Sequence, residues 1–324
     1  MKFSICIPVY NGEITILDSL KSALNQNFNH DYKVHIVDNN SSDNTLLICE
    51  KLNNTKVFIH KFDITVPAGE NFQRCIDICD TTYLIYLSSD DILDSNCLNR
   101  YKNFLDMNKN LSIISRTYYW FEDDTNIPTR ATNQLEKHTN INIKSNHNDL
   151  LNFIDSTCQL SGLLIEKSKI KNKIKSKPFV ELPSIVLPIL KTNEAIHLKY
   201  NSVAVRTSSS GANLKKTYDI SAALSWYDLF QENFLEYKDL LNFLINNYIS
   251  KNYESLVQIK INGGYIKFIK EVYFFIKINN KILLDPKFYI YILILHLPNN
   301  ILEKIKIFYK KIKVNDVSLN NLIE

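Results

Sequence analysis

The stretch that most constrains the fold of this 324-residue chain is an apolar run that ends abruptly in acidic residues. Residues 83–87 (Tyr-Leu-Ile-Tyr-Leu) predict a strand buried on both faces, as in a parallel sheet. Ser88, Ser89, Asp90 and Asp91 follow at once. Ligands of open α/β sheets bind beyond the carboxyl ends of such strands, so two adjacent carboxylates favour a cation with oxygen ligands, Mg²⁺ or Mn²⁺. A solvated turn that caps the next helix is the alternative.

Composition sets the size and class of the protein. Hydrophobic residues make up 45% and charged residues 22%, which favours one large α/β domain with an appendage, or two domains, over global disorder. No run of 18 apolar residues occurs, so we expect no membrane-spanning helix. The segment 1–8 lacks the pattern of a signal peptide, and the six cysteines form no CxxC pair. We therefore expect a cytosolic protein with reduced thiols.

Strand-like and helix-like segments alternate over the first part of the chain. This alternation predicts a mostly parallel sheet built from crossover connections. Polar clusters follow each of the longer apolar runs, so we expect them at one edge of the sheet. The expected strands are 2–9, 32–37, 56–60, 83–87, 112–120 and 195–206, and the expected helices are 13–26, 45–52 and 68–79.

Three of these strand ends resemble the motifs of glycosyltransferase family 2. The matching segments are 4–11 (Ser-Ile-Cys-Ile-Pro-Val-Tyr-Asn), 37–43 (Val-Asp-Asn-Asn-Ser-Ser-Asp) and 87–91 (Leu-Ser-Ser-Asp-Asp), in the family's order and at its intervals. The resemblance implies the GT-A fold, an α/β Rossmann-like, mostly parallel central sheet flanked by helices. It is clear to about residue 125, weaker to about residue 215, and only compositional beyond.

The resemblance also implies a nucleotide-sugar site at these strand ends. Pro8, Tyr10 and Asn11 would border the nucleotide, with Tyr10 stacked on or beside the base. Asp38 would accept the imide N–H of uracil or thymine, an edge that a carboxylate matches well. Without the resemblance, a simple Asx turn is the favoured interpretation of Asp38.

In the same comparison, Asp90 and Asp91 would hold the metal and the diphosphate, where the ion offsets the charge of the leaving group. Many family members begin this loop with aspartate where the chain has Ser88, so Ser88 is not assigned as a ligand. Arg74 lies where members carry residues near the base and diphosphate, and it could pair with phosphate. An exposed helical arginine is the alternative for Arg74.

The catalytic base is expected near Glu181. Family members usually carry an acidic pair here, one member of which deprotonates the acceptor hydroxyl. The chain has Glu181 followed by Leu182, and a strict alignment places Leu182 at the base's position. We expect Glu181 to act as the base because direct displacement needs one carboxylate near the acceptor. Asp155 is the second candidate, and Glu181 also fits a helix-start acid stabilised by the dipole.

The chain is expected to divide into a catalytic domain at 1–215 and a helical, basic C-terminal extension at 216–324. Residues 260–313 hold eleven lysines against three acidic residues, about +8 in a chain of net charge +4. Lysines beside aromatic and aliphatic residues favour a helix at an anionic membrane surface. Packing on the catalytic domain, with solvated lysines, is the alternative.

Together these features predict an inverting glycosyltransferase that uses Mn²⁺ or Mg²⁺. It would move a sugar from a nucleotide diphosphate sugar to a glycan or lipid-linked acceptor at the inner face of the cytoplasmic membrane. The resemblance extends to bacterial enzymes of O-antigen, lipopolysaccharide core or capsule synthesis. An inactive glycan-assembly scaffold is the alternative, prompted by Ser88 and Leu182 at usually acidic positions. A nucleotidyltransferase is disfavoured because no glycine-rich, basic phosphate loop follows the first strand.

Overall fold

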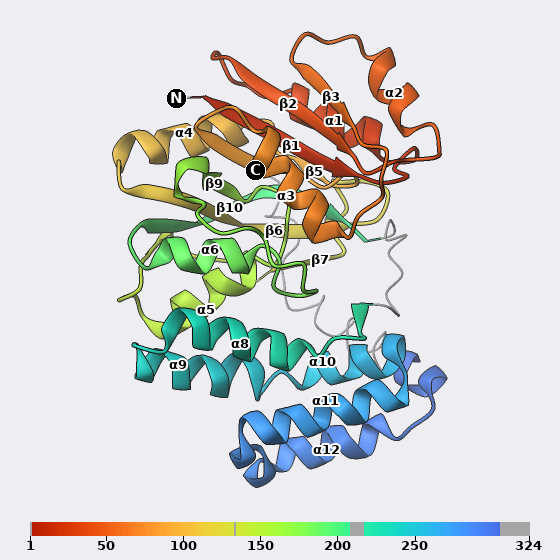
Figure 1. Cartoon of the computed structure of the whole chain (residues 1–324), viewed down its shortest axis with the longest axis vertical. Coiled ribbons are helices and arrows are strands. Elements are labelled where there is room, and N and C mark those ends of the chain that lie inside the picture. The colour runs from red at the N-terminus through yellow and green to blue at the C-terminus, as the bar shows by residue number, and fades with distance from the viewer. Residues whose placement is uncertain (1, 133, 208–216, 305–324) are drawn as a thin grey trace. The chain divides into compact units, whose positions relative to one another are not determined.

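The structure is a computed structural model that describes residues 2–132, 134–207 and 217–304. It divides into two compact units, which are described separately (Figure 1). The first comprises chiefly Met1–Ser176 and Glu181–Ser210, and the second comprises Lys177–Val180 with the helices after residue 216.

The first unit is built on a sheet in which six strands run in the same direction. The strand order β3-β2-β1-β4-β9-β6-β10-β5 reverses its course between β1 and β4. This arrangement confirms the predicted α/β fold with a mostly parallel sheet. The parallel strands are β1 (Phe3–Val9), β2 (Tyr32–Asp38), β3 (Val57–Lys61), β4 (Tyr83–Tyr86), β6 (Leu111–Phe121) and β10 (Glu194–Arg206); the short antiparallel strands are β5 (Ile92–Leu93), β7 (Arg130–Ala131), β8 (Thr139–Ile141) and β9 (Leu164–Glu166).

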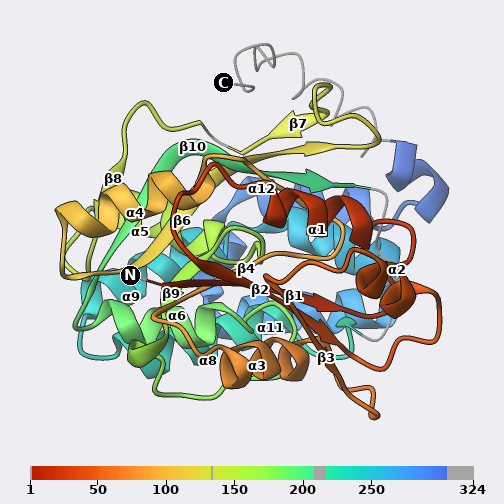
Figure 2. The ribbon, with the colours of Figure 1, turned by 90° about the horizontal axis from the view of Figure 1, so that it is seen from above.

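Helices cover both faces of this sheet (Figure 2). Alternate residues of β1 point to opposite faces, as pleating requires. Phe3 and Ile5 join a core that includes residues of α1 (Ile16–Leu24), α2 (Thr45–Lys51) and α4 (Cys97–Met107). On the other face the Cys6 thiol donates to the Cys75 carbonyl of α3 (Ala68–Ile78). Further along the chain α5 (His147–Ser156) packs on β6, and α6 (Pro183–Leu190) packs on β10.

One segment of the first unit differs from the sequence-based expectation. Residues 158–165 resemble a family strand, but only β9, from Leu164, is extended. The preceding residues form a turn in which Gly162 has a φ of +77°, a conformation that disfavours side chains. A Cβ atom at Gly162 would lie 2.6 Å from the Val203 side chain and 2.9 Å from that of Arg116. The turn therefore depends on glycine.

The second unit consists of helices, several of them short. The expected helical run 218–253 is interrupted after residue 234 and by a π-helical turn, η2 (Ile245–Ile249). Among the described residues, no helix has the length and apolarity needed to cross a bilayer. The sequence also predicts a Ser/Gly loop at 207–211 and a basic amphipathic helix at 301–314, and most residues of both segments lie outside the described ranges. The helices are α8 (Ala222–Phe234), α9 (Lys238–Leu244), α10 (Tyr253–Gln258), α11 (Tyr265–Ile278) and α12 (Pro286–Leu295), with the turns η3 (Ile259–Gly263) and η4 (Asn280–Leu284).

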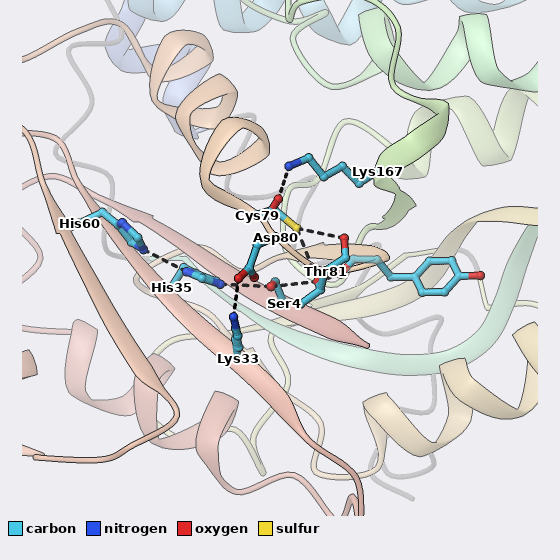
Figure 3. Close-up of polar contacts among 9 residues, drawn as sticks. Ser4, Lys33, His35, His60, Cys79, Asp80, Thr81 and Lys167 are labelled. Carbon is cyan, nitrogen blue, oxygen red and sulfur yellow. Dashed lines mark hydrogen bonds and ion pairs between the residues drawn. The ribbon is translucent and has the colours of Figure 1, made fainter. Parts of the chain in front are cut away.

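A polar cluster crosses the first three strands under α3 (Figure 3). His35 is 3% exposed, and its ring contacts the Ser4 hydroxyl at 3.1 Å and the His60 ring at 3.0 Å. Thr81 continues the chain of contacts by donating to Ser4. Burial, followed by the neighbouring His60, lowers the pKa of His35 to about 4. His35 is therefore neutral in the folded protein at neutral pH.

This cluster predicts that acid destabilises the protein through His35. The pKa of His35 is lowered from 6.5 to about 4. The contribution of neutral His35 to the free energy of unfolding is therefore complete above pH 6.5 and is lost as the pH falls towards 4. The loss reaches about 3 kcal/mol at most. Urea denaturation of the wild-type protein and of His35→Gln at pH 7.5 and pH 5 measures this loss. The free energy of unfolding should fall less between the two pH values in the variant than in the wild-type protein. An equal loss in both proteins would contradict the assignment.

Candidate active site

The loops that follow β1, β2 and β4 contact one another directly. Asn11 donates its backbone N–H to the Ser41 hydroxyl at 2.9 Å and accepts from the Ser42 N–H at 2.8 Å. A Cβ atom at Gly12 would lie 3.5 Å from the Ser89 hydroxyl. The three motifs that follow these strands therefore form one continuous surface at the carboxyl edge of the sheet.

The strands β1 and β4 separate before they reach the carboxyl edge of the sheet. The pairing of β1 with β4 ends at Cys6 and Tyr86, whereas its pairing with β2 continues to Val9 and Asp38. Pro8 is buried just beyond the divergence, where its missing N–H leaves no donor unpaired towards β4. A sheet whose strand order reverses at this point offers its ligand crevice there.

Asp38 ends β2 with its side chain fully buried. One carboxylate oxygen, Oδ2, accepts the backbone N–H of Ser41 at 3.1 Å. The other, Oδ1, has no partner among the described residues. Asn71 of α3 lies close by, since its amide donates to the Val37 carbonyl, and its own buried Oδ1 also lacks a partner in the described part of the chain. A buried acceptor without a donor is costly, so Asp38 is suited to receive an N–H from a ligand.

Tyr10 and Arg74 differ in how available they are to a ligand. The Tyr10 side chain is 53% exposed at the end of β1 and is free to lie against a planar ring. The Arg74 guanidinium donates to the Asn39 side chain at 2.9 Å and to the Ile64 carbonyl at 3.0 Å, and it stacks on Phe62. Arg74 thus braces the loops beside Asp38, which differs from the exposed helical arginine considered above.

Asp90 and Asp91 lie just beyond β4, and Asp91 is 2% exposed. Asp91 accepts the Ser161 hydroxyl at Oδ2 (2.6 Å) and the Arg206 backbone N–H at Oδ1 (2.9 Å). The next element is strand β5, so the alternative of a solvated helix-capping turn is wrong. The two carboxylates instead form a partly buried pair of like charge.

The electrostatics of this pair favour a cation. Burial, and then the charge of Asp90, raise the pKa of Asp91 to about 7. Among the described residues, no group of three or more His, Cys, Asp or Glu side chains could enclose an ion alone. Two carboxylates suit Mg²⁺ or Mn²⁺, because such ions are often held by one or two carboxylates together with substrate phosphates. The donor set therefore fits a metal that binds with a diphosphate.

Arg206 stabilises the same loop from β10. Its side chain donates to the Asp90 carbonyl at 3.2 Å and to the Glu122 carbonyl at 3.2 Å, and it pairs with Asp18 at 3.2 Å. The Arg206 guanidinium therefore holds the backbone of Asp90 in place.

The candidate bases lie on different elements. Glu181 is half-buried just before α6, and its Cγ would lie 3.1 Å from a Cβ atom at Gly69. Gly69 belongs to the first turn of α3, which follows β3 at the carboxyl edge, so Glu181 lies on the edge that carries Asp38. Leu182 is buried, and Asp155 is exposed in the last turn of α5.

Sequence reasoning missed the residues that hold Asp91. Ser161, and Gln159 at 3.5 Å, contact its Oδ2 atom from about seventy positions away. Arg116 lies behind them, completely buried in β6. One signal was available, because a single charge inside the apolar strand 111–121 requires buried partners.

A mostly parallel sheet whose strand order reverses between β1 and β4, with helices on both faces, defines a doubly wound α/β protein. The chain belongs to glycosyl transferase family 2, whose model matches residues 4–169, just over half of its length. The fold is similar to that of TarS from S. aureus (residues 1–349; TM-score 0.66, 17% identity, covering 87% of this chain and 82% of TarS). It is also similar to a mannosyltransferase from Pyrobaculum calidifontis solved with GDP-Man and Mn²⁺ (TM-score 0.55, 11% identity, 88% and 87% covered). The predicted family, fold and enzyme class are confirmed.

Two relatives indicate the range of related activities. A poly(ribitol-phosphate) beta-glucosyltransferase of Bacillus spizizenii is 34% identical over 108 residues, 32% of this chain and 17% of that protein. WfaP of Escherichia coli, a UDP-Glc:alpha-D-GlcNAc-diphosphoundecaprenol beta-1,3-glucosyltransferase, is 24% identical over 215 residues, 66% of this chain and 75% of WfaP. The chain spans only 14% to 36% of the length of three relatives from Bacillus.

Proposed function

We propose that this chain transfers a sugar, with inversion, from a uridine diphosphate sugar to a glycan or lipid-linked acceptor of a bacterial surface polysaccharide. The observation that carries this proposal is the buried Asp38 Oδ1 atom, which has no hydrogen-bond partner within residues 2–132, 134–207 and 217–304 and lies at the edge that also holds the Asp90–Asp91 pair. The two features match the two ends of a nucleotide diphosphate. Names of relatives support the donor and acceptor classes, since WfaP is named for UDP-Glc and a diphosphoundecaprenol acceptor.

In this proposal each residue has a separate task. Tyr10 lies against the base, Asp38 accepts the uracil imide N–H, and Asn11 fixes the loops between them. Asp90 and Asp91 would hold Mn²⁺ or Mg²⁺, which would supply positive charge beside the departing diphosphate. Glu181 accepts the proton of the acceptor hydroxyl. The hydroxyl oxygen attacks the anomeric carbon of the donor sugar as the bond between that carbon and the diphosphate breaks.

A donor panel tests this function. The protein is incubated with Mn²⁺, UDP-, GDP- or dTDP-sugars, and membrane extract as acceptor, while nucleotide release is measured; the thermal shift of the protein with each nucleotide sugar measures binding. We expect metal-dependent release of UDP that increases with acceptor. Binding without turnover would favour the scaffold alternative, and no metal-dependent binding of any nucleotide would overturn the proposal.

Base recognition by Asp38 gives a narrower prediction. Asp38→Asn should weaken binding of UDP about 10- to 100-fold, because an acceptor that faces the imide N–H is lost or becomes neutral. Calorimetric titration measures the change, and binding of Mn²⁺-pyrophosphate, which lacks a base, serves as the control. Unchanged UDP affinity in the variant would remove Asp38 from the base site.

We also propose that the second unit binds the cytoplasmic face of an anionic membrane, within the synthesis of O-antigen, lipopolysaccharide core or capsule. Around α12, Leu284, Ile290 and Leu293 are 83%, 54% and 72% exposed, beside the exposed Lys281 and Lys287. Apolar side chains flanked by lysines suit a bilayer interface.

Vesicle sedimentation tests this membrane proposal. The protein should sediment with vesicles of phosphatidylglycerol and phosphatidylcholine, and less with phosphatidylcholine alone. Ile290→Glu combined with Leu293→Glu should abolish sedimentation. Equal sedimentation of the variant and the wild-type protein with anionic vesicles would contradict the membrane proposal and leave only the interpretation that the C-terminal extension packs on the catalytic domain.

A further inference from the structure

Arg116 is a completely buried cation that binds the segment next to the Asp90–Asp91 pair but does not bind either carboxylate itself. It lies within β6, and its guanidinium donates to the Ser156 carbonyl at 3.1 Å and to the Gln159 carbonyl at 3.0 Å. The first carbonyl belongs to the last residue of α5, where a cation also complements the helix dipole. Arg116 therefore fixes the chain as it leaves α5.

The segment that Arg116 fixes, residues 156–161, contacts the Asp91 carboxylate. From this segment, Gln159 donates its amide to Asp91 Oδ2 at 3.5 Å, and Ser161 donates its hydroxyl to the same atom at 2.6 Å. Ser161 also accepts the backbone N–H of Ser88 at 2.8 Å, so it joins both ends of the acidic loop. The orientation of the Asp91 carboxylate thus depends on where residues 156–161 lie.

Close packing leaves this segment little freedom. Gly162 follows it, and a Cβ atom there would lie 2.9 Å from Arg116 Nε. The Tyr101 hydroxyl donates to the Gly162 carbonyl at 2.6 Å, and the Gly162 N–H donates to the Tyr86 carbonyl at 2.7 Å. The turn is therefore pressed between β4 and the Arg116 side chain.

Fold stability alone does not explain a buried arginine here. A buried charge loses its hydration, and well-packed apolar residues often replace buried ionic groups without loss of stability. Arg116 Nε also lacks a partner in the described part of the chain, which adds to the cost. A residue retained at such a cost can instead specify one arrangement of its neighbours.

We propose that Arg116 is a positioning residue of the metal–diphosphate site, which fixes residues 156–161 so that Ser161 and Gln159 hold the Asp91 carboxylate. The inference rests on the proposed function, because it assigns Asp91 to the metal. Arg116 itself contacts neither metal nor donor. Its loss should therefore impair binding of the diphosphate while sparing binding of the base.

Calorimetry with three variants tests this role. UDP is titrated in Mn²⁺, and uridine monophosphate is titrated without metal as a measure of the base site. Arg116→Met should weaken Mn²⁺-dependent UDP binding at least tenfold and change uridine monophosphate binding less than twofold, and Arg116→Lys should recover part of the loss. Ser115→Ala is the matched control, because the Ser115 hydroxyl contacts the Ser156 hydroxyl at the same helix end but does not bind the backbone carbonyls that Arg116 holds, and this variant should bind UDP as the wild-type protein does.

The outcomes separate the inference from the proposed function. Wild-type UDP affinity in folded Arg116→Met, or equal loss for both nucleotides, would overturn the positioning role. If Arg116→Met does not fold, Arg116→Lys and a fourth variant, Gln159→Ala, decide together: wild-type UDP affinity in both would also overturn the positioning role. Absence of metal-dependent UDP binding by the wild-type protein would overturn the proposed function, and this inference with it.

Discussion

Replacing Asp91 with asparagine should reduce metal-dependent sugar transfer by roughly 10³-fold while the protein remains folded. Asparagine keeps the shape of the side chain and one oxygen for the Arg206 N–H, and its amide can donate to the Ser161 hydroxyl. It removes the charge that the metal requires. Nucleotide release from UDP-sugar at saturating Mn²⁺ measures the effect.

The same variant should be at least as stable as the wild-type protein without metal. Burial and the charge of Asp90 raise the pKa of Asp91 to about 7, so the ionised form opposes folding and its cost grows as the pH rises from about 4 to 7. A neutral amide avoids this cost. Thermal unfolding at pH 8 should give an equal or higher midpoint for Asp91→Asn. Full activity in the variant would remove Asp91 from the metal site.

Replacing Glu181 with glutamine should lower the rate of transfer by roughly 10² to 10⁴-fold, the usual contribution of a positioned general base. Glutamine preserves the packing of Glu181 against the first turn of α3 but cannot accept the acceptor's proton. Affinity for UDP should remain that of the wild-type protein. Initial rates at saturating donor and acceptor, with UDP titration alongside, separate the two quantities.

Asp155→Asn is the matched control for this second prediction. Asp155 is exposed on α5, and its replacement should leave transfer close to the wild-type rate. Loss of activity in Asp155→Asn with a fully active Glu181→Gln would assign the base to Asp155. Full activity in both variants would exclude both carboxylates.

The part of the fold that depends on local pattern was predictable. The strands β1, β2 and β4 are largely apolar segments, and a cluster of polar residues follows each of them in the sequence. Parallel strands bring their carboxyl ends to one edge, so the proximity of Asn11, Asp38 and Asp91 follows from topology. The structure places these clusters in contact through Asn11 and Gly12, as the sequence implied.

The surroundings of Asp91 could not be predicted in the same way. Ser161 reaches Asp91 only because β9 inserts antiparallel between β4 and β6, a pairing that no local pattern encodes. Residues 158–165 resemble a strand of the family, but Gly162 adopts a positive φ and the extended chain begins only at Leu164. Arg74 and Arg206 also bind neighbouring loops in the structure, a use that sequence alone does not distinguish from phosphate binding.

The most direct test of the central claim is calorimetric titration of UDP into the wild-type protein in the presence of Mn²⁺ and again in EDTA. A nucleotide diphosphate held by Asp38 at its base and by a metal on Asp90 and Asp91 should bind at least tenfold more tightly with Mn²⁺, and Asp91→Asn should lose this difference. Equal UDP affinity in Mn²⁺ and EDTA, or a metal effect that survives in Asp91→Asn, would contradict the account.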